Sequence, residues 1–142
     1  MQILTTDPVK EPSRILYRRC VLDLRTGEQK FNDVPCNNLE DVLGGFGRSF
    51  QQLAQRPVKQ AYCDENPLII NIGLLTGSTA MTGMRTYFSA YSPLKQSLKG
   101  LPAAIWSAGS GKFGAKFKWT GLDELILENR ADKPVYLLIS HT

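Results

Sequence analysis

The chain has 142 residues, of which 42% are hydrophobic and 21% are charged, and its formal net charge is +4. This composition excludes a disordered or collagen-like chain, and the length predicts one domain that can bury a hydrophobic core. The charge suits an anionic ligand or an acidic partner, although a solvated basic surface is the simpler explanation. The sequence lacks the dense Lys/Arg stripe with interleaved aromatic residues that is typical of nucleic-acid binding.

The cysteines and the apolar runs indicate in which cellular compartment the protein lies. Cys20, Cys36 and Cys63 form no Cys-x-x-Cys pair, so we expect neither a zinc knuckle nor an iron–sulfur cluster on this chain. Reduced thiols are typical of a cytoplasmic protein. The first residues lack the apolar core of a signal peptide, and no apolar run reaches the about 18 residues of a transmembrane helix. We therefore expect a cytoplasmic protein without a membrane span.

The N-terminal part predicts an arm and a hairpin. Residues 1–13 are polar and read as a flexible arm ahead of a single domain over residues 14–142. Residues 14–24 alternate imperfectly between apolar and polar side chains, as in a strand. A turn at residues 25–28 lets residues 29–31 return as the second strand of a β-hairpin.

Two helical segments are expected next. An asparagine cap predicts a helix that starts near Leu39, and Gly44-Gly45 interrupts it. Aromatic and apolar side chains at helical spacing then predict a second segment that runs to about Gln55 and ends before a proline. The double glycine marks either a helix kink or a close backbone approach to a ligand, and we favour the structural explanation.

The second half of the chain predicts most of a sheet. Apolar β-type runs end at turns of small residues, and the first run is apolar throughout, which is typical of a central, buried strand. A short helix, stopped at Thr120-Gly121, and two more strands joined as a hairpin should follow. The expected strands are residues 68–75, 86–92, 103–107, 123–128 and 135–139, and the expected helix is residues 113–119. The predicted fold class is α+β, with β-rich mixed or antiparallel sheets and two or three short helices.

Residues 109–114 match the pattern G-x-G-x-x-G between a predicted strand and a predicted helix, as in a dinucleotide-binding fingerprint. The helix has room for only about eight residues, whereas a parallel crossover needs about a dozen. We therefore reject a dinucleotide site. We interpret the motif as a glycine-rich turn whose free N–H groups can receive an anion, with Arg85 and several lysines nearby.

Catalytic constellations are sparse. The single histidine, His141, stands one residue from the end of the sequence, which argues against Ser/His or Cys/His chemistry. The adjacent acid pairs Asp64/Glu65 and Asp123/Glu124 cannot flank one bond, and we expect them to be solvated turn acids. Whether the chain is an enzyme is left open by these residues.

A series of motifs carries a family resemblance. The segment ENPLIINIGLLTGSTA is followed by GMR, SPL, SAGSGKFGAKFKWTGLDELILE and ADKPVYLLI. Upstream, RILYRRCVLDLRTGEQK and VLGGFGRSFQQL match an opening hairpin and a glycine-rich helix start. In order and spacing this series resembles the N-terminal domain of the aldehyde ferredoxin oxidoreductase family, which are tungsten- or molybdenum-pterin enzymes. The resemblance covers about residues 14–140.

The resemblance implies a β-rich base under a tungstopterin or molybdopterin. Arg85 would then contact the pterin or its phosphate, because a guanidinium is a planar, permanently charged, forked donor. Gly109, Ser110 and Gly111 would lie against the pterin. Ala108 stands where the family has an asparagine, whose backbone carbonyl is thought to bind the magnesium that joins the pterin phosphates.

Two departures and the extent of the match leave two hypotheses. Lys116 stands where the family has glutamate and Leu74 where it has proline. The family's later domains, cluster cysteines and substrate channel are not matched. The first hypothesis is a cofactor-binding domain or small subunit that is not catalytically complete alone. The alternative is a non-catalytic interaction or assembly module that keeps the fold without the cofactor. Open sheet edges favour a homo-oligomer or a larger catalytic subunit as the partner.

Overall fold

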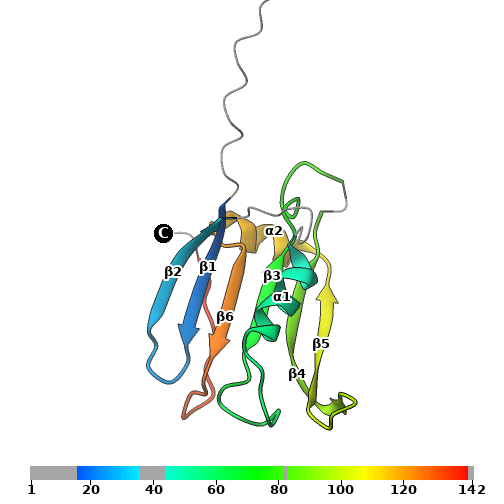
Figure 1. Cartoon of the computed structure of the whole chain (residues 1–142). Helices are drawn as coiled ribbons and strands as arrows, with labels where there is room; N and C mark the ends of the chain where they lie inside the picture. Colours follow the sequence, from blue (N-terminus) through cyan, green and yellow to red (C-terminus); the bar gives the residue numbers. More distant parts are fainter. Residues whose placement is uncertain (1–15, 36–43, 82, 141–142) are drawn as a thin grey trace, which may run out of the picture.

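The computed structural model describes residues 16–35, 44–81 and 83–140, which form a six-stranded sheet with two helices (Figure 1). The elements in chain order are β1 (Leu16–Asp23), β2 (Gln29–Pro35), α1 (Gly45–Ala54), β3 (Leu68–Ile72), β4 (Thr86–Gln96), β5 (Pro102–Gly109), α2 (Lys112–Trp119) and β6 (Glu124–Glu128). The predicted α+β class is confirmed. None of the helices in these ranges is both long and apolar enough to cross a membrane.

The sheet has the strand order β2-β1-β6-β3-β4-β5. The pairings β1–β2, β3–β4, β3–β6 and β4–β5 are antiparallel, whereas β1 and β6 run parallel. β6, the last described strand, is therefore inserted between the opening hairpin and β3. β2 and β5 form the two edges.

The helices cover opposite faces of the sheet. Alternate residues of β3 point to the two faces. Ile70 and Ile72 pack in the core on one face and Ile69 packs in the core on the other, so the prediction of a central strand is confirmed. α1 covers the face in front of β3 and β4 in Figure 1. The core on the α1 face contains Leu53, Ile69 and Ile126. The core on the α2 face contains Cys20, Ile70, Ile72, Phe117, Leu122, Leu125 and Leu127.

The double glycine serves the packing of α1. The backbone conformation of Gly44 has φ 92°, and a Cβ there would lie 3.1 Å from the carbonyl oxygen of Ile72. Gly44 also forms an isolated bridge with Gly73. The close approach is thus to the chain's own backbone, which supports the structural explanation. The helix predicted near Leu39 and the arm at residues 1–13 lie outside the described residues.

The predicted strand at residues 135–139 is wrong. These residues form an extended segment outside the sheet, and no backbone–backbone hydrogen bond within the described ranges involves residues 131–140. A returning strand has no place beside β6, because β1 and β3 already occupy both of its edges. By the same topology, β5 and β6 are not neighbours, so the strands on either side of α2 form no βαβ unit.

Candidate functional site

The five predicted site residues come together at one end of the β4–β5 hairpin. Thr86 pairs with Gly109 and Tyr87 pairs with Ala108. Because directly opposed antiparallel residues lie about 5 Å apart, this register brings the backbone of Arg85 beside the turn that follows Gly109. Arg85, Ala108, Gly109, Ser110 and Gly111 are all exposed. All five therefore lie exposed at the same end of the hairpin.

Close packing at Gly114 fixes α2 against this end of the hairpin. A Cβ on Gly114 would lie 2.8 Å from the carbonyl oxygen of Met84 and 2.8 Å from Thr86 Oγ1. A Cβ on Gly77 would lie 3.2 Å from the Cα of Ala115, so the loop before β4 also packs closely on the helix. The absence of side chains at these two positions lets the first turn of α2 lie directly on the backbone that enters β4.

The N-terminus of α2 is uncapped. Gly111 has φ 106°, a conformation that favours glycine, and no side chain bonds to the first backbone N–H groups of the helix. The first turn contains no acidic residue. The N–H groups and the helix dipole leave partial positive charge there, which favours an anion. A Cβ built on Gly111 meets nothing within 4 Å, so space is open for a ligand.

Positively charged residues stand near this turn at the start of β4 and on α2. Arg85, Lys112 and Lys116 are exposed, and none of them forms an ion pair with an acidic side chain of the described residues. A guanidinium and two ammonium groups without acidic partners raise the local concentration of anions. Together with the uncapped helix, they make this end of the hairpin suitable for a phosphate group.

The same surface offers little for metal or acid–base chemistry. It contains no histidine, cysteine or carboxylate, and no group of three or more such side chains lies together anywhere in the described ranges. Ala108 belongs to the edge strand β5, where some carbonyl groups point away from β4. A backbone carbonyl is a suitable ligand for magnesium, but one carbonyl must share the ion with other donors.

An aromatic cluster that sequence reasoning missed flanks the site on the α1 face. The rings of Phe46 and Trp106 stack with centroids 5.5 Å apart, and Tyr87 lies within 6 Å of both. Tyr87 is the partner of Ala108 in the sheet, so the cluster adjoins the site directly. Phe46 and Trp106 are 48% and 49% exposed. The aromatic residues were visible in the sequence, but only the β4–β5 register and the docking of α1 show that they meet.

The prediction that Asp123 and Glu124 are solvated is wrong. Glu124 is 0% exposed and forms an ion pair with Arg19, its partner in the parallel β1–β6 pairing. Asp123 is 4% exposed, accepts a hydrogen bond from the backbone N–H of Arg18 at 3.0 Å and pairs with Lys118. The sequence alone could not identify these partners. The residues of β1 lie about a hundred residues earlier in the chain, and Lys118 reaches Asp123 only through the turn that follows α2. These acids are structural and lie outside the candidate site.

The other acid pair agrees with its prediction. Asp64 pairs with Arg25 at the protein surface, and Glu65 is exposed.

Tyr17, on β1, is a further buried polar group. Its hydroxyl donates a 2.6 Å hydrogen bond to the carbonyl oxygen of Ile72, and burial, followed by the charge of Glu124, raises its pKa. It acts as a neutral hydrogen-bond donor in the core.

The comparisons with known proteins agree on one family. A family model described as the N-terminal domain of aldehyde ferredoxin oxidoreductase matches residues 19–142. A tungsten-containing aldehyde ferredoxin oxidoreductase from Pyrococcus furiosus is 35% identical over 121 residues, which are 83% of this chain and 19% of the relative. The corresponding protein from Pyrococcus abyssi is 40% identical over 95 residues, which are 67% of this chain and 15% of the relative.

A solved structure shares the fold. The active-site complex BamBC of benzoyl coenzyme A reductase, in complex with 1,5-dienoyl-CoA, has a TM-score of 0.76 at 29% identity. The match covers 88% of this chain and 19% of that chain. The chain thus spans less than a fifth of the length of these relatives. Because this family model matches residues 19–142, the chain belongs to the aldehyde ferredoxin oxidoreductase family and corresponds to its N-terminal domain.

Proposed function

We propose that this chain is the part of an aldehyde ferredoxin oxidoreductase-like enzyme that holds one face of a tungstopterin or molybdopterin through its phosphate. The observation that carries the proposal is that the backbone of Arg85 lies beside the uncapped, glycine-rich N-terminus of α2. The curated relatives are tungsten-containing enzymes, which supports a pterin-bound metal as the ligand.

Each residue of the site has a distinct role in the proposal. Arg85 donates its forked N–H groups to a phosphate, and the first N–H groups of α2 complete the anion site. Gly109, Ser110 and Gly111 have small side chains or none, so a planar ring can approach the backbone closely. The backbone carbonyl of Ala108 binds magnesium. The cofactor supplies the redox chemistry when bound, whereas these residues bind and orient it.

In this proposal, residues outside this chain carry out the rest of the reaction. The site has no acid–base side chain of its own, and the match covers less than a fifth of the relatives. We therefore propose a larger catalytic partner that supplies the substrate channel and the electron-transfer centre, with self-association through the open edges β2 and β5 as a further contact. Free thiols at Cys20 and Cys63 support a cytoplasmic location.

A non-catalytic assembly module is the second candidate function. Lys116 replaces the family's glutamate on the helix of the site, and the half-exposed rings of Phe46 and Trp106 adjoin the open edge strand β5. Aromatic residues are enriched at protein interfaces. This surface would bind another protein whether or not a cofactor is present.

The test measures tungsten, molybdenum and pterin in the chain purified anaerobically from a host that makes the cofactor. We compare the wild type with Arg85→Ala and with Lys99→Ala, a matched loss of one positive charge at the opposite end of the β4–β5 hairpin. The proposal expects cofactor in the wild type and in Lys99→Ala, and its loss in Arg85→Ala without a change in thermal unfolding.

Other outcomes discriminate the two candidates. Equal retention by both variants, or unfolding of Arg85→Ala, would refute the role of Arg85. A wild-type chain without metal or pterin that still co-purifies with a partner would favour the assembly module. Both residues are exposed, so neither substitution removes a core contact.

A further inference from the structure

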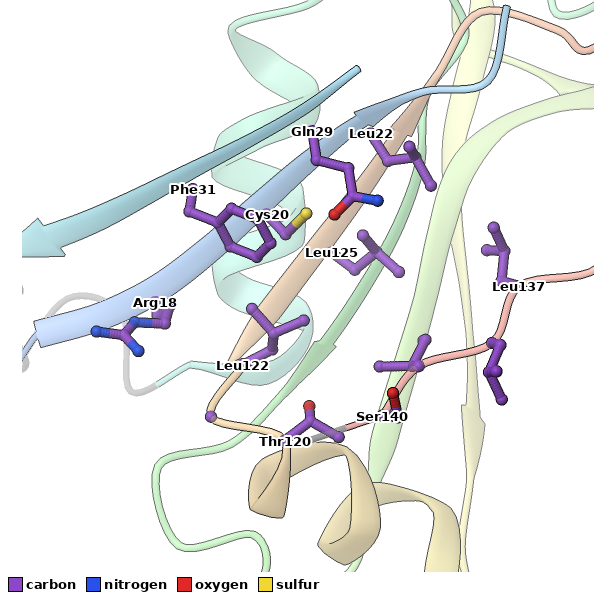
Figure 2. A pocket seen from close by; sticks show the side chains of 13 residues that line it. Arg18, Cys20, Leu22, Gln29, Phe31, Thr120, Leu122, Leu125, Leu137 and Ser140 are labelled. Carbon is purple, nitrogen blue, oxygen red and sulfur yellow. The ribbon is translucent and has the colours of Figure 1, made fainter. Parts of the chain in front are cut away.

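The two faces of the sheet differ in how many buried polar atoms they leave without a hydrogen bond. On the α2 face, β1 and β6 contribute Cys20, Leu22 and Leu125 to an apolar core (Figure 2). Six buried side-chain nitrogen and oxygen atoms of the described residues have no hydrogen-bond partner, and five of them lie on the α1 face. Because buried polar groups are nearly always hydrogen-bonded, this concentration indicates a ligand on that face. The five atoms are Arg19 Nη2, Arg48 Nε, Ser49 Oγ, Asn71 Oδ1 and Ser89 Oγ.

Ser49 and Ser89 face each other between α1 and β4. At one end of the helix, a Cβ on Gly45 would lie 2.9 Å from the ring of Tyr87. At the other end, the hydroxyl of Tyr91 donates a 2.7 Å hydrogen bond to a carbonyl oxygen in the last turn of α1. Ser49 is one helical turn from each of these contacts, and Ser89 is two residues from each tyrosine. Because these spacings keep side chains on one face of a helix and of a strand, the two serines lie opposite one another.

Asn71 completes this group from the neighbouring strand β3. Its direct partners in the sheet are Tyr87 on β4 and Glu124 on β6, and Ser89 is its diagonal neighbour on the same face. Asn71 Nδ2 lies 3.5 Å from Glu124 Oε1, and only the nitrogen of the amide can donate to a carboxylate. Asn71 Oδ1 is therefore turned away from β6, toward β4 and Ser89.

These three side chains are enclosed completely, and they do not bond to one another. Ser49, Asn71 and Ser89 are 0%, 0% and 1% exposed, and each has an oxygen atom without a partner. Polar groups too far apart for a direct hydrogen bond are commonly bridged by water. An internal water needs about two to four polar partners, and this group supplies three. The protons balance as well, because a water can donate to Asn71 Oδ1 and to one serine while it accepts the hydroxyl proton of the other serine.

The charges of the same face favour a neutral ligand. Arg19 and Arg48 would repel a cation bound beside them, and the buried carboxylate of Glu124 would repel an anion. Arg19 already pairs with Glu124, so the layer needs no further charge from that pair. Water meets this condition and forms the required hydrogen bonds.

We propose that Ser49, Asn71 and Ser89 bind one ordered water molecule, which joins α1 to the sheet. Of the four buried residues of α1, only Leu53 has a large apolar side chain. The helix therefore docks mainly through small and polar groups, and the water adds hydrogen bonds where apolar contact is sparse. The site does not depend on a bound cofactor, because none of its three residues belongs to the candidate cofactor site.

The water lies close to the aromatic cluster and helps to hold it. α1 carries Phe46, whose ring stacks on Trp106 with centroids 5.5 Å apart. The third ring belongs to Tyr87, the direct sheet partner of Asn71. Loss of the water should therefore loosen the docking of α1 beside the candidate site.

The first experiment measures urea unfolding of the full chain. If Ser89 bonds to a water, Ser89→Ala should raise the equilibrium constant for unfolding about fivefold, because a buried hydrogen bond is lost. If its hydroxyl is buried without a partner, the same substitution should lower that constant, because alanine removes a desolvation cost. Ser107→Ala, at an exposed position on β5, is the matched control and should leave the constant unchanged.

A double-mutant cycle then tests whether the two serines share the ligand. The gain in helix propensity from Ser49→Ala cancels in the cycle, so the coupling reports only the interaction between the two sites. We expect the double variant to raise the unfolding constant less than the product of the two single effects. A crystal structure of the full chain should show one water about 3 Å from all three oxygens, and no water there in the double variant.

Three results would overturn the proposal. The first is an unfolding constant that Ser89→Ala lowers or leaves unchanged. The second is a double variant whose effect equals the product of the single effects, which would mean that Ser49 and Ser89 share no ligand. The third is a crystal structure in which Ser49 bonds directly to Ser89 or to Asn71 with no water between them.

Discussion

Gly114→Ala is the substitution that most directly tests how the candidate site is positioned. Gly114 is buried in α2, where alanine is intrinsically better than glycine by about 1 kcal/mol in the helix interior. Here, however, the added Cβ would lie 2.8 Å from the carbonyl oxygen of Met84, 2.8 Å from Thr86 Oγ1 and 3.0 Å from Thr76 Cγ2. The sign of the effect therefore depends on whether packing outweighs propensity.

The packing term is the larger one. Overfilling a well-packed site costs about 1–3 kcal/mol, and the upper end applies because the nearest atom belongs to the backbone that enters β4 and cannot rotate away. Subtracting the gain of about 1 kcal/mol in helix propensity leaves a net destabilisation of about 2 kcal/mol. With a urea m-value of about 2 kcal/mol/M, the unfolding midpoint should fall by about 1 M.

The assay is urea unfolding of Gly114→Ala beside Lys116→Ala, an exposed position in the same helix. The control should change the free energy of unfolding by less than about 0.5 kcal/mol. An unchanged or raised midpoint for Gly114→Ala, with the control unchanged, would show that α2 does not lie directly on the start of β4. The proposed closeness of Arg85 to the helix N-terminus would then fail with it.

Three further predictions concern stability. Glu124→Ala should lower the free energy of unfolding by about 3–5 kcal/mol in urea, because it leaves the charge of Arg19, whose side chain is only 14% exposed, without its partner; a change below 1 kcal/mol would contradict this. The pKa of Asp23 is lowered, first by the backbone N–H of Thr26, so its carboxylate stabilises the fold above about pH 4 and loses this effect as the pH falls through the lowered pKa; an acid titration of thermal stability should be flatter for Asp23→Asn, and identical profiles would refute the role. Amide hydrogen exchange should be fastest along residues 131–140 and slowest in β3, and protection of the former would reveal hydrogen bonds that the fold lacks.

Local patterns were sufficient for most of the elements. The run of β3, in which every residue except Asn71 is apolar, predicted a strand buried on both faces, and the turn residues around Gly27 predicted the opening hairpin. The short helix at residues 113–119 was also predicted, with its stop at Thr120-Gly121. In each case the decisive information lies within about ten residues of the element.

Long-range pairing could not be predicted in the same way. The run at residues 135–139 has the composition of a strand, but both edges of β6 are occupied, and composition does not show occupancy. Glu124 looked like a surface acid until the parallel register placed Arg19 beside it. The residues of the candidate site were chosen from a motif series, whereas their adjacency depends on the pairing of Thr86 with Gly109.

The insertion of β6 has a consequence for how the chain folds during synthesis. Residues 19–23 of β1 pair in parallel with residues 124–128, so the opening hairpin stays apart from the rest of the sheet until almost the whole described chain has left the ribosome. Until then β3 can pair only with β4, and its other edge, which is strongly apolar, is open to other chains. Sheets that depend on such distant contacts fold slowly and expose aggregation-prone edges until those contacts form. Truncations before residue 128 should therefore yield aggregates in which the β1–β2 hairpin and the β3–β4–β5 unit never join.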